Sequence, residues 1–345
     1  MDAKVSNTMI AIHHSKSGFS DRWIAYCKAN NITYKIVNCY RSDIIDQLID
    51  CNALMWHINH QNSKDVLFGR QLLYSVQAGG KKVFPDYNTV WHFDDKVGQK
   101  YLLEAIGAPL VPTWVFYSKK DAFEWAENTI FPKVFKLRGG AGSANVRLAN
   151  TKREAIGLIK KAFAGGFSQY DAVGNLKERI RKYQLGKTDL YDVFKGFIRF
   201  VYPTRYSIIG GRERGYVYFQ EFVPGNNYDI RVIVIGDKAF AIKRMVRKDD
   251  FRASGSGNIK FEKINFNNET ICMSFKLAES LKSQSVAFDY VYKDGNPVVV
   301  EISYGFAKEV YDSCVGYWDK NLNWNEGSFN PYGWMVELIK DQQNE

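Results

Sequence analysis

The sequence predicts an α/β protein, with a small parallel domain over about the first ninety residues and a larger α+β region after it. Up to Pro85, short apolar runs alternate with helical patterns, which is typical of parallel strands joined by helices. Near the end of the chain, β-branched and aromatic runs follow each other across tight turns, which indicates antiparallel hairpins. A length of 345 residues is enough for two or three domains.

Composition narrows the class of partner. The net charge of +10 favours anionic partners such as nucleotides, acidic sugars or nucleic acid. The most basic run, Lys177 to Lys187, is interspersed with acidic and apolar residues and is typical of a solvated helix face, so we expect no nucleic-acid partner. The five cysteines include no CxxC pair, which favours reduced thiols and a cytoplasmic location. No apolar run is typical of a signal peptide or a membrane segment.

The first domain is expected to contain four strands and three longer helices. The strands are predicted over Met9–His13, Thr33–Val37, Ala53–Ile58 and Lys82–Phe84, and the helices over Ser20–Ala29, Ser42–Ile49 and Ser63–Ala78. Histidines follow two of these strands, in His13–Lys16 and His57–His60. Ligands of parallel sheets sit at such strand ends, so these residues could line a substrate pocket, although ordinary loop roles are favoured.

The second region begins with a helix over Asp94–Ile106. Further elements are predicted as a strand over Val111–Tyr117, a helix over Asp121–Asn128, a strand over Lys133–Leu137 and a helix over Lys152–Phe163. A glycine-rich loop, Arg138 to Val146, follows the second strand. Backbone N–H groups of such loops bind phosphate, but the spacing matches neither the P-loop nor the dinucleotide fingerprint, and a plain hairpin loop is equally compatible. Phe167 to Arg214 matches no regular pattern.

The chain ends in strands and one long helix. Strands are predicted over Tyr216–Val223, Asp229–Ile235, Ala239–Met245 and the hairpin Val286–Ser303, and a helix that packs on this hairpin over Thr270–Leu281.

The hairpin carries one carboxylate in each apolar strand, Asp289 and Glu301. A three-residue turn, Asp294 to Asn296, places the two acids opposite each other, whereas a two-residue turn places them on different faces. Converging carboxylates suit Mg²⁺, and an ion pair with Lys or Arg from another strand is the alternative.

The order of these features resembles the ATP-grasp superfamily, in the branch of glutathione synthetases and ribosomal-protein glutamate ligases. The similar part runs from about Asp94 to Ile339, and the first domain looks like that family's pre-ATP-grasp domain. The resemblance implies an ATP-grasp fold preceded by a small parallel α/β domain. It divides the chain into 1–93 and 94–345, the latter into a nucleotide subdomain, 94–220, and a metal and acceptor subdomain, 221–345.

The resemblance also implies roles for individual residues. Two lysines, a mobile glycine loop and a hinge strand would bind ATP: Lys96, Lys136, Gly139, Gly140, Gly142, Ser143, Gln220, Glu221, Phe222 and Val223. Two arginines, Arg231 of a D-x-R strand and Arg244, would stabilise the transferring phosphoryl group. Asp289 and Glu301 resemble the Mg²⁺ ligands.

Two positions depart from the family pattern. Ser303 stands where the family has a metal-binding asparagine, and a hydroxyl is a shorter and weaker donor than an amide carbonyl. The acidic residue that grips the ribose after the hinge is missing, and Asn226 or Asn227 could replace it.

The implied activity is an ATP-dependent carboxylate–amine ligase that acts through an acyl phosphate, with ATP and Mg²⁺, or Mn²⁺, as cofactors. Its partners would be a small carboxylate and an amine. The sequence is compatible with a homo-oligomer and does not decide the oligomeric state. Aromatic and Asn residues in Tyr304–Trp334 suit an acidic sugar, although packing of a C-terminal cap is the favoured explanation. The alternatives are a small-molecule kinase and a non-catalytic nucleotide-binding regulatory protein.

Overall fold

The chain folds into two compact units, each described here by itself. The computed structural model describes residues 9–16, 18–140, 145–168, 172–184, 186, 188–201, 209–247, 251–253 and 255–340. Unit 1 consists of Met1–Phe93, Leu102–Pro109 and Gly225–Glu345, and unit 2 of Asp94–Tyr101 and Leu110–Pro224. None of the described helices is both long and apolar enough to cross a lipid bilayer.

The first part of unit 1 is a parallel four-stranded sheet in the order β2-β1-β3-β4. Its two central strands, β1 and β3, are fully buried because helices connect the strands and cover the sheet. The strands are β1 (Ile10–His13), β2 (Tyr34–Val37), β3 (Ala53–Met55) and β4 (Lys82–Phe84). The helices are α1 (Ser20–Ala29), α2 (Ile44–Gln47), α3 (Ser63–Ala78) and α4 (Tyr87–Val90). The predicted parallel domain is confirmed.

The second part of unit 1 is a seven-stranded sheet in the order β15-β14-β11-β12-β16-β17, with β13 paired to β12. The strands are β11 (Tyr228–Ile235), β12 (Lys238–Met245), β13 (Ile259–Lys260), β14 (Ser285–Lys293), β15 (Asn296–Ser303), β16 (Gly316–Asp319) and β17 (Trp324–Glu326). The 3₁₀ turn Lys263–Asn265 and the helices α11 (Asn268–Leu281), α12 (Lys308–Tyr311) and α13 (Pro331–Lys340) complete it. Neighbouring strands in this sheet pair antiparallel, as expected for the α+β region.

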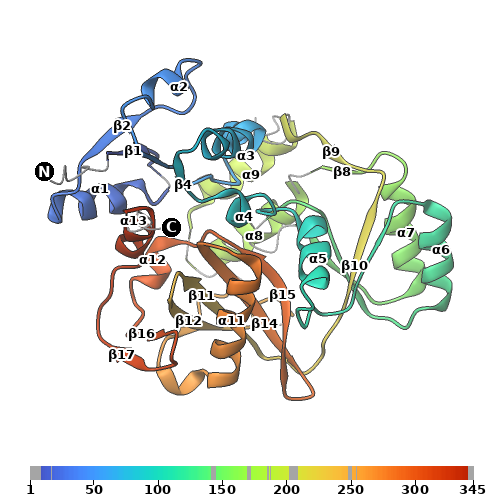
Figure 1. The fold of residues 1–345 in the computed structure, drawn as a ribbon. Coiled ribbons are helices and arrows are strands. Elements are labelled where there is room, and N and C mark those ends of the chain that lie inside the picture. The colour runs from blue at the N-terminus through green and yellow to red at the C-terminus, as the bar shows by residue number, and fades with distance from the viewer. Residues whose placement is uncertain are drawn as a thin grey trace, which may run out of the picture. The chain divides into compact units, whose positions relative to one another are not determined.

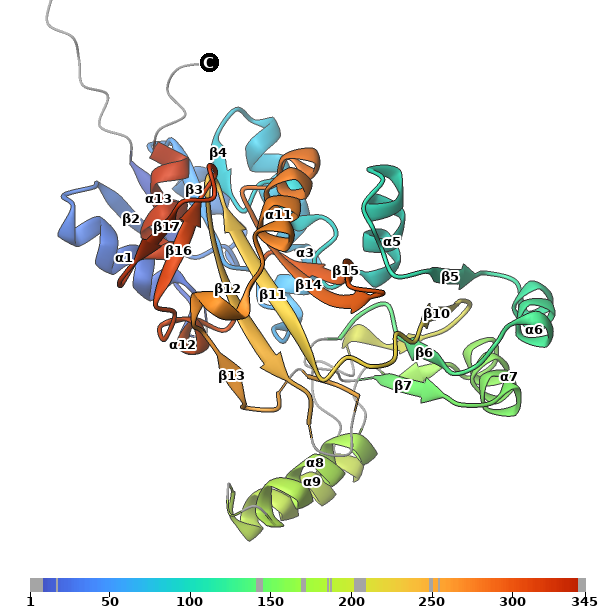
Figure 2. The ribbon, with the colours of Figure 1, turned by 90° about the horizontal axis from the view of Figure 1, so that it is seen from below.

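Helix α11 lies against one face of this sheet (Figure 2). The Asn267 side chain caps the helix by accepting a hydrogen bond from the backbone N–H of Thr270. The Ser274 and Tyr290 hydroxyls lie 3.0 Å apart and connect α11 to β14. The predicted packing of this helix on the hairpin is confirmed.

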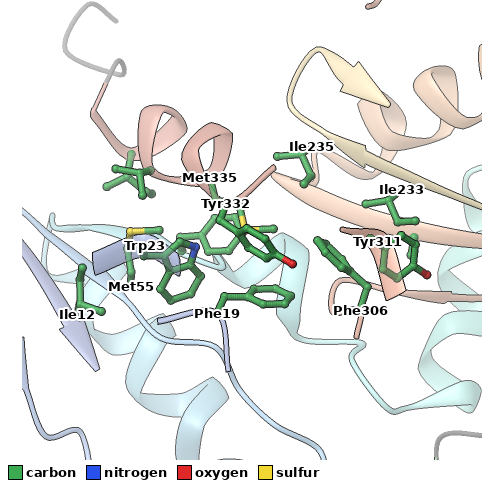
Figure 3. Packing of buried hydrophobic residues seen from close by; sticks show 14 of the residues in the cluster. Ile12, Phe19, Trp23, Met55, Ile233, Ile235, Phe306, Tyr311, Tyr332 and Met335 are labelled. Atoms are coloured by element: carbon green, nitrogen blue, oxygen red, sulfur yellow. The ribbon is translucent and has the colours of Figure 1, made fainter. Parts of the chain in front are cut away.

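The opposite face of the sheet shares a hydrophobic core with the parallel domain. Phe19, just before α1, and Trp23 of α1 pack together with Ile233 of β11 and Met335 of α13 (Figure 3). Helices α1 and α13 touch so closely that a Cβ at Gly333 would lie 2.4 Å from the ring of Tyr26. The two sheets of unit 1 are therefore joined by a continuous core.

Unit 2 is built on an antiparallel sheet in the order β5-β10-β6-β7. Its strands are β5 (Thr113–Phe116), β6 (Lys133–Lys136), β7 (Val146–Ala149) and β10 (Val217–Glu221), and β8 (Phe167–Ser168) pairs with β9 (Arg212–Glu213). Helices α6 (Lys119–Asn128) and α7 (Lys152–Ala162) pack on this sheet, and their buried side chains form its core together with Phe135 of β6 and Phe219 of β10. Helix α5 (Lys96–Ala105) begins in this unit.

The segment that matched no sequence pattern contains a pair of helices, α8 (Ala172–Gln184) and α9 (Leu190–Val201). They lie side by side in both ribbon views (Figures 1 and 2). The helices approach closely at Gly196, where a Cβ would lie 2.9 Å from a methyl carbon of Leu176. Glycines and interspersed charges weaken the helical pattern in the sequence, so packing between the two helices stabilises them more than propensity does.

Candidate functional site

The turn of the β14–β15 hairpin differs from the three-residue turn used in the sequence argument. Lys293 pairs with Asn296, so the turn has two residues, Asp294 and Gly295. Both have positive φ, 52° and 81°, as a type I′ hairpin turn requires. The three-residue turn is therefore wrong, because Asn296 already belongs to the strand.

The two acids nevertheless lie opposite each other. The register shifts between Asp289 and Tyr290: Tyr290 pairs with Val299, whereas Asp289 pairs with Glu301. One extra residue in β15 makes this shift, which is the definition of a β-bulge. The bulge thus has the effect that the sequence argument assigned to a longer turn.

Asp289 belongs to a largely buried cluster of four charged side chains, which are 9% to 20% exposed. Arg231 binds it with two hydrogen bonds, Nε to Oδ1 at 2.5 Å and the terminal nitrogen to Oδ2 at 2.7 Å. Arg244 binds Asp229 in the same bidentate manner, at 2.6 and 2.7 Å, and reaches Asp289 at 3.0 Å. The predicted ion pair with basic residues of neighbouring strands is present, and it brings together three of the predicted site residues.

The cluster follows from strand alternation. Asp229 and Arg231 are two residues apart in β11, and Arg231 pairs with Asp289 across the sheet. Continuing on the same face, Ile233 and Ile235 enter the hydrophobic core shared with the parallel domain. One face of the sheet is therefore charged at one end and apolar at the other, which fixes the arginines on a rigid base.

The opposing charges hold Asp289 ionised. Burial alone would raise the pKa of Asp289, but Arg231 and Arg244 outweigh this effect and lower the pKa to about 2. Burial would likewise lower the pKa of Arg231, and the neighbouring Asp289 instead raises it. Both residues stay charged at neutral pH.

Stability should therefore depend on pH through Asp289. Its pKa is depressed from 3.8 in the unfolded chain to about 2 in the fold, so the ionised group stabilises the fold above pH 4. This contribution, about 2 kcal/mol, should be lost as the pH falls from about 4 to about 2. Urea unfolding across this window measures it. An Asp289→Asn variant with the same pH dependence would contradict the prediction.

The carboxylate oxygens of Asp289 and Glu301 are of the type that binds divalent metals such as Mg²⁺. An ionised carboxylate has about four lone-pair sites, and the two arginines occupy three of those of Asp289. The Ser303 hydroxyl donates to the carbonyl of Gly305 and accepts from its N–H. Among the residues that the structure describes, no group of three or more His, Cys, Asp or Glu side chains could hold a metal.

Tyr311 of α12 was not anticipated as part of the site. It is 5% exposed, and its hydroxyl lies near enough to Arg231 to affect the pKa of that guanidinium. Burial raises the pKa of Tyr311, while the two arginines act against this rise. No motif marks this residue, because it comes from a short helix 80 positions after Arg231 in the chain.

Tyr311→Phe should release one constraint on Arg231 without changing the shape of the core. We expect about 1 kcal/mol lower stability and an about tenfold lower rate of ATP turnover at unchanged KM for ATP. Tyr317→Phe is the matched control, since the Tyr317 ring packs on Phe329 and Trp334. Equal rates for the two variants would show that Tyr311 only fills the core.

In unit 2, Lys96 opens α5 and contacts the glycine loop. Its Nζ donates to the carbonyl of Gly140 at 2.7 Å, and the N–H of Gly140 donates to Asp94 Oδ1 at 2.8 Å. Arg138 is tied to the same helix start, because it pairs with Asp95 at 2.8 Å. The helix start thus holds the first residues of the loop.

Lys136 lies at the end of β6 and is 5% exposed. Its Nζ donates to Gln220 Oε1 at 2.7 Å, and the Gln220 amide donates to Thr113 Oγ1 at 3.1 Å. The side chain of Gln220 therefore positions the lysine. The N–H of Glu221 donates to the carbonyl of Pro112, which leaves Phe222 and Val223 as the part of the predicted hinge beyond the sheet.

Other predicted residues have different outcomes. Gly139 lies next to the side chain of Asp94. Gly142 and Ser143 lie outside the described residues. The Asn226 amide is engaged with the backbone of Tyr292, donating at 3.0 Å and accepting at 2.8 Å. Its side chain therefore anchors β14, and a ribose-binding residue after the hinge stays a prediction.

The histidines at the strand ends are structural. His13 accepts a hydrogen bond from the N–H of Cys39, and His57 from the N–H of Phe19, whose ring stacks on it at 3.8 Å. Burial lowers the pKa of His57 to about 3, so the ring is neutral and suited to accept this bond. The favoured assignment of ordinary structural roles agrees with these contacts.

Comparisons with known proteins agree with this architecture. Residues 205–315, which contain the charged cluster and Tyr311, match the model of the RimK-like ATP-grasp domain. A search of curated proteins finds no match.

Several solved structures share the fold over nearly the whole chain. A RimK domain ATP-grasp protein from Sphaerobacter thermophilus has 14% identity and a TM-score of 0.54, covering 96% of this chain and 100% of that one. D-alanine–D-alanine ligase from Bacillus anthracis complexed with ATP has 13% identity, a TM-score of 0.57 and coverages of 97% and 96%. The ATP-grasp ligase PsnB complexed with a minimal precursor has 12% identity, a TM-score of 0.56 and coverages of 98% and 100%.

The chain thus has the fold of the ATP-grasp proteins. More particularly, residues 205–315 match a RimK-like ATP-grasp domain. The predicted resemblance to the ATP-grasp superfamily is confirmed.

Proposed function

We propose that this protein is an ATP-dependent carboxylate–amine ligase that acts through an acyl phosphate. One observation carries the proposal: Arg231, Arg244 and Asp289 form a buried cluster on one sheet face, and Glu301 lies opposite Asp289. This arrangement combines cations for phosphoryl oxygens with acids for a metal, and it occurs in a chain with an ATP-grasp fold.

The chemistry needs positioned charge more than a nucleophilic side chain. A carboxylate is a poor electrophile, and transfer of the terminal phosphoryl group of ATP gives it a good leaving group. Arg231 and Arg244 would stabilise the charge on the transferring phosphoryl oxygens, because they are buried and held in place before the reaction. An amine would then attack the carbonyl carbon and expel phosphate, forming an amide.

Unit 2 would bind the nucleotide. Lys136 is buried and held by Gln220, and Lys96 is held at the start of the glycine loop. Lysine at such positions acts as a point charge for phosphate oxygens. Phe222 and Val223, just beyond β10, would present backbone groups to the adenine edge.

Asp289 and Glu301 would hold Mg²⁺, which prefers carboxylate oxygens and bound phosphates. The metal would neutralise phosphate charge during transfer. Ser303 is a weaker candidate, since its hydroxyl forms the Gly305 turn. Asp289 has about one lone-pair site beyond its bonds to arginine, so it would contribute a single bond unless Arg231 moves.

The bonds that the Asp289 carboxylate already forms with Arg231 and Arg244 also support a second candidate function, a non-catalytic nucleotide-binding protein. In this case Asp289 would serve only to neutralise the arginines, and ATP would bind without turnover.

The test is ADP and phosphate release by the purified protein with ATP, Mg²⁺ and panels of carboxylic acids and amines. The ligase should release both products only when an acid and an amine are present, and mass spectrometry should find the amide. A phosphorylated product without phosphate release would identify a kinase, and ATP binding without turnover would favour the regulatory protein.

Glu301→Gln is the decisive variant, because it removes one charge and keeps the shape. It should lower the turnover about 10²-fold or more. Glu326→Gln, in β17 of the same sheet, is its control. Equal turnover of both variants would refute the assignment of Glu301 as a metal ligand.

A further inference from the structure

Helix α9 carries an unusual group of exposed apolar side chains. Five of its large hydrophobic residues are between 41% and 65% exposed, and they are Leu190, Tyr191, Phe194, Phe197 and Ile198. No other described helix exposes more than three large apolar side chains. Groups of this kind mark interaction surfaces more often than isolated exposed residues do.

These residues form one stripe along the helix. Positions 190, 194, 197 and 198 recur at the spacing of one helical face. Val193 and Gly196 are buried instead, and Gly196 faces Leu176 of α8. The stripe therefore lies beside the contact between α8 and α9, and within the described part of the chain neither helix covers it.

The sequence of the helix pair and its connection is basic. Residues 172–201 include seven Lys or Arg and three Asp or Glu, which leaves four net positive charges on this helix pair. One of the acids, Asp192, is already bound by Arg179. Lys195 lies over the ring of Tyr191 at 4.4 Å, so a cation borders the apolar surface directly.

This charge favours one kind of occupant. A second copy would bring two helix pairs of the same net charge together, which is unfavourable in a symmetric contact. A protein partner would need a groove that matches one helix face and acidic residues around it. An anionic bilayer supplies apolar depth and negative charge together, without any matching shape, and aromatic and aliphatic residues bordered by cations are typical of interfacial helices.

We propose that the apolar stripe of α9 lies in the surface of an anionic lipid bilayer and attaches this protein to it. Phe194 and Phe197 would enter the boundary between headgroups and acyl chains, and Lys195 would remain at the level of the lipid phosphates. This inference is independent of the proposed ligase activity.

The test is flotation of the full-length protein with vesicles. We expect binding to vesicles of phosphatidylcholine with one third phosphatidylglycerol, weak binding to pure phosphatidylcholine, and release at high salt because the attraction is screened. The double variant Phe194→Glu with Phe197→Glu should bind the anionic vesicles at least about tenfold more weakly.

The matched control is Ile130→Glu with Ile264→Glu. It changes the net charge equally at two exposed isoleucines outside the helix pair, and it should bind as the unchanged protein does. Thermal unfolding and ATP affinity of both variants check the fold. Phe197→Gln, which adds no charge, should also weaken binding.

Several results would overturn the proposal. They are an unchanged protein that does not float with anionic vesicles, equal binding to neutral vesicles, and unchanged binding of the double variant. Binding of poly-glutamate in place of vesicles, lost in the double variant, would show an acidic protein partner. A dimer in light scattering that the double variant abolishes, without vesicle binding, would show a second copy.

Discussion

Asp289→Asn should lower the rate of ATP turnover about 10²-fold or more and the free energy of unfolding by about 3 kcal/mol at neutral pH. The reason is the cluster itself, in which Asp289 accepts bonds from Arg231 and Arg244 in a buried place. Removing the negative charge leaves two buried cations with Asp229 alone to balance them. It also removes a proposed metal ligand, so the rate should fall about 10²-fold or more.

Asp312→Asn is the control for this variant. Asp312 pairs with Arg22 at 2.6 Å, but both side chains are 43% exposed. Exposed pairs contribute about 0–1 kcal/mol, so the same chemical change should cost little there. Urea unfolding and ADP release separate the two effects. Wild-type ADP release by Asp289→Asn would refute its role in phosphoryl transfer, and equal stability of the two variants would refute the importance of the cluster.

Lys136→Met should weaken ATP binding about 10²-fold, because a buried cation is lost at the end of β6. Calorimetric titration with ATP and with adenosine measures the effect. The loss should be larger for ATP, since the lysine is assigned to phosphate. The variant also leaves Gln220 Oε1 without its donor Lys136, so we expect about 1–3 kcal/mol lower stability.

Lys133→Met is the matched control, three residues earlier in the same strand. Lys133 is also buried, but its Nζ lies 4.7 Å from the ring centre of Trp114. Residues three apart in a strand point to opposite faces, so only Lys136 is assigned to the nucleotide. Equal ATP affinities of the two variants would contradict this assignment.

Sequence reasoning predicted the fold class and most of the strands, because their patterns are local. It also singled out Asp289 and Glu301, since each is a charge in an otherwise apolar strand, and Arg231 and Arg244 through the resemblance to the ATP-grasp superfamily. It could not predict how Asp289 is shared between two arginines, because this depends on the pairing of β11, β12 and β14.

The register of the β14–β15 hairpin could not be predicted from the sequence either. A β-bulge has no reliable local signal, so the opposition of the two acids was attributed to a longer turn. Thr113 and Tyr311 were missed because each supports a predicted residue from a distant segment. The α8–α9 pair was missed because its stability comes from contact between the helices, through Gly196, and not from sequence pattern.

The core of unit 1 has a consequence for truncation. Ile233, Ile235 and Met335 are buried together with Phe19 and Trp23, which come from the beginning of the chain (Figure 3). Deleting residues 1–93 would expose the apolar side chains that Phe19 and Trp23 cover, and we expect the truncated protein to aggregate. A minimal catalytic fragment of this protein must therefore keep its leading ninety residues, whether or not they ever touch a substrate.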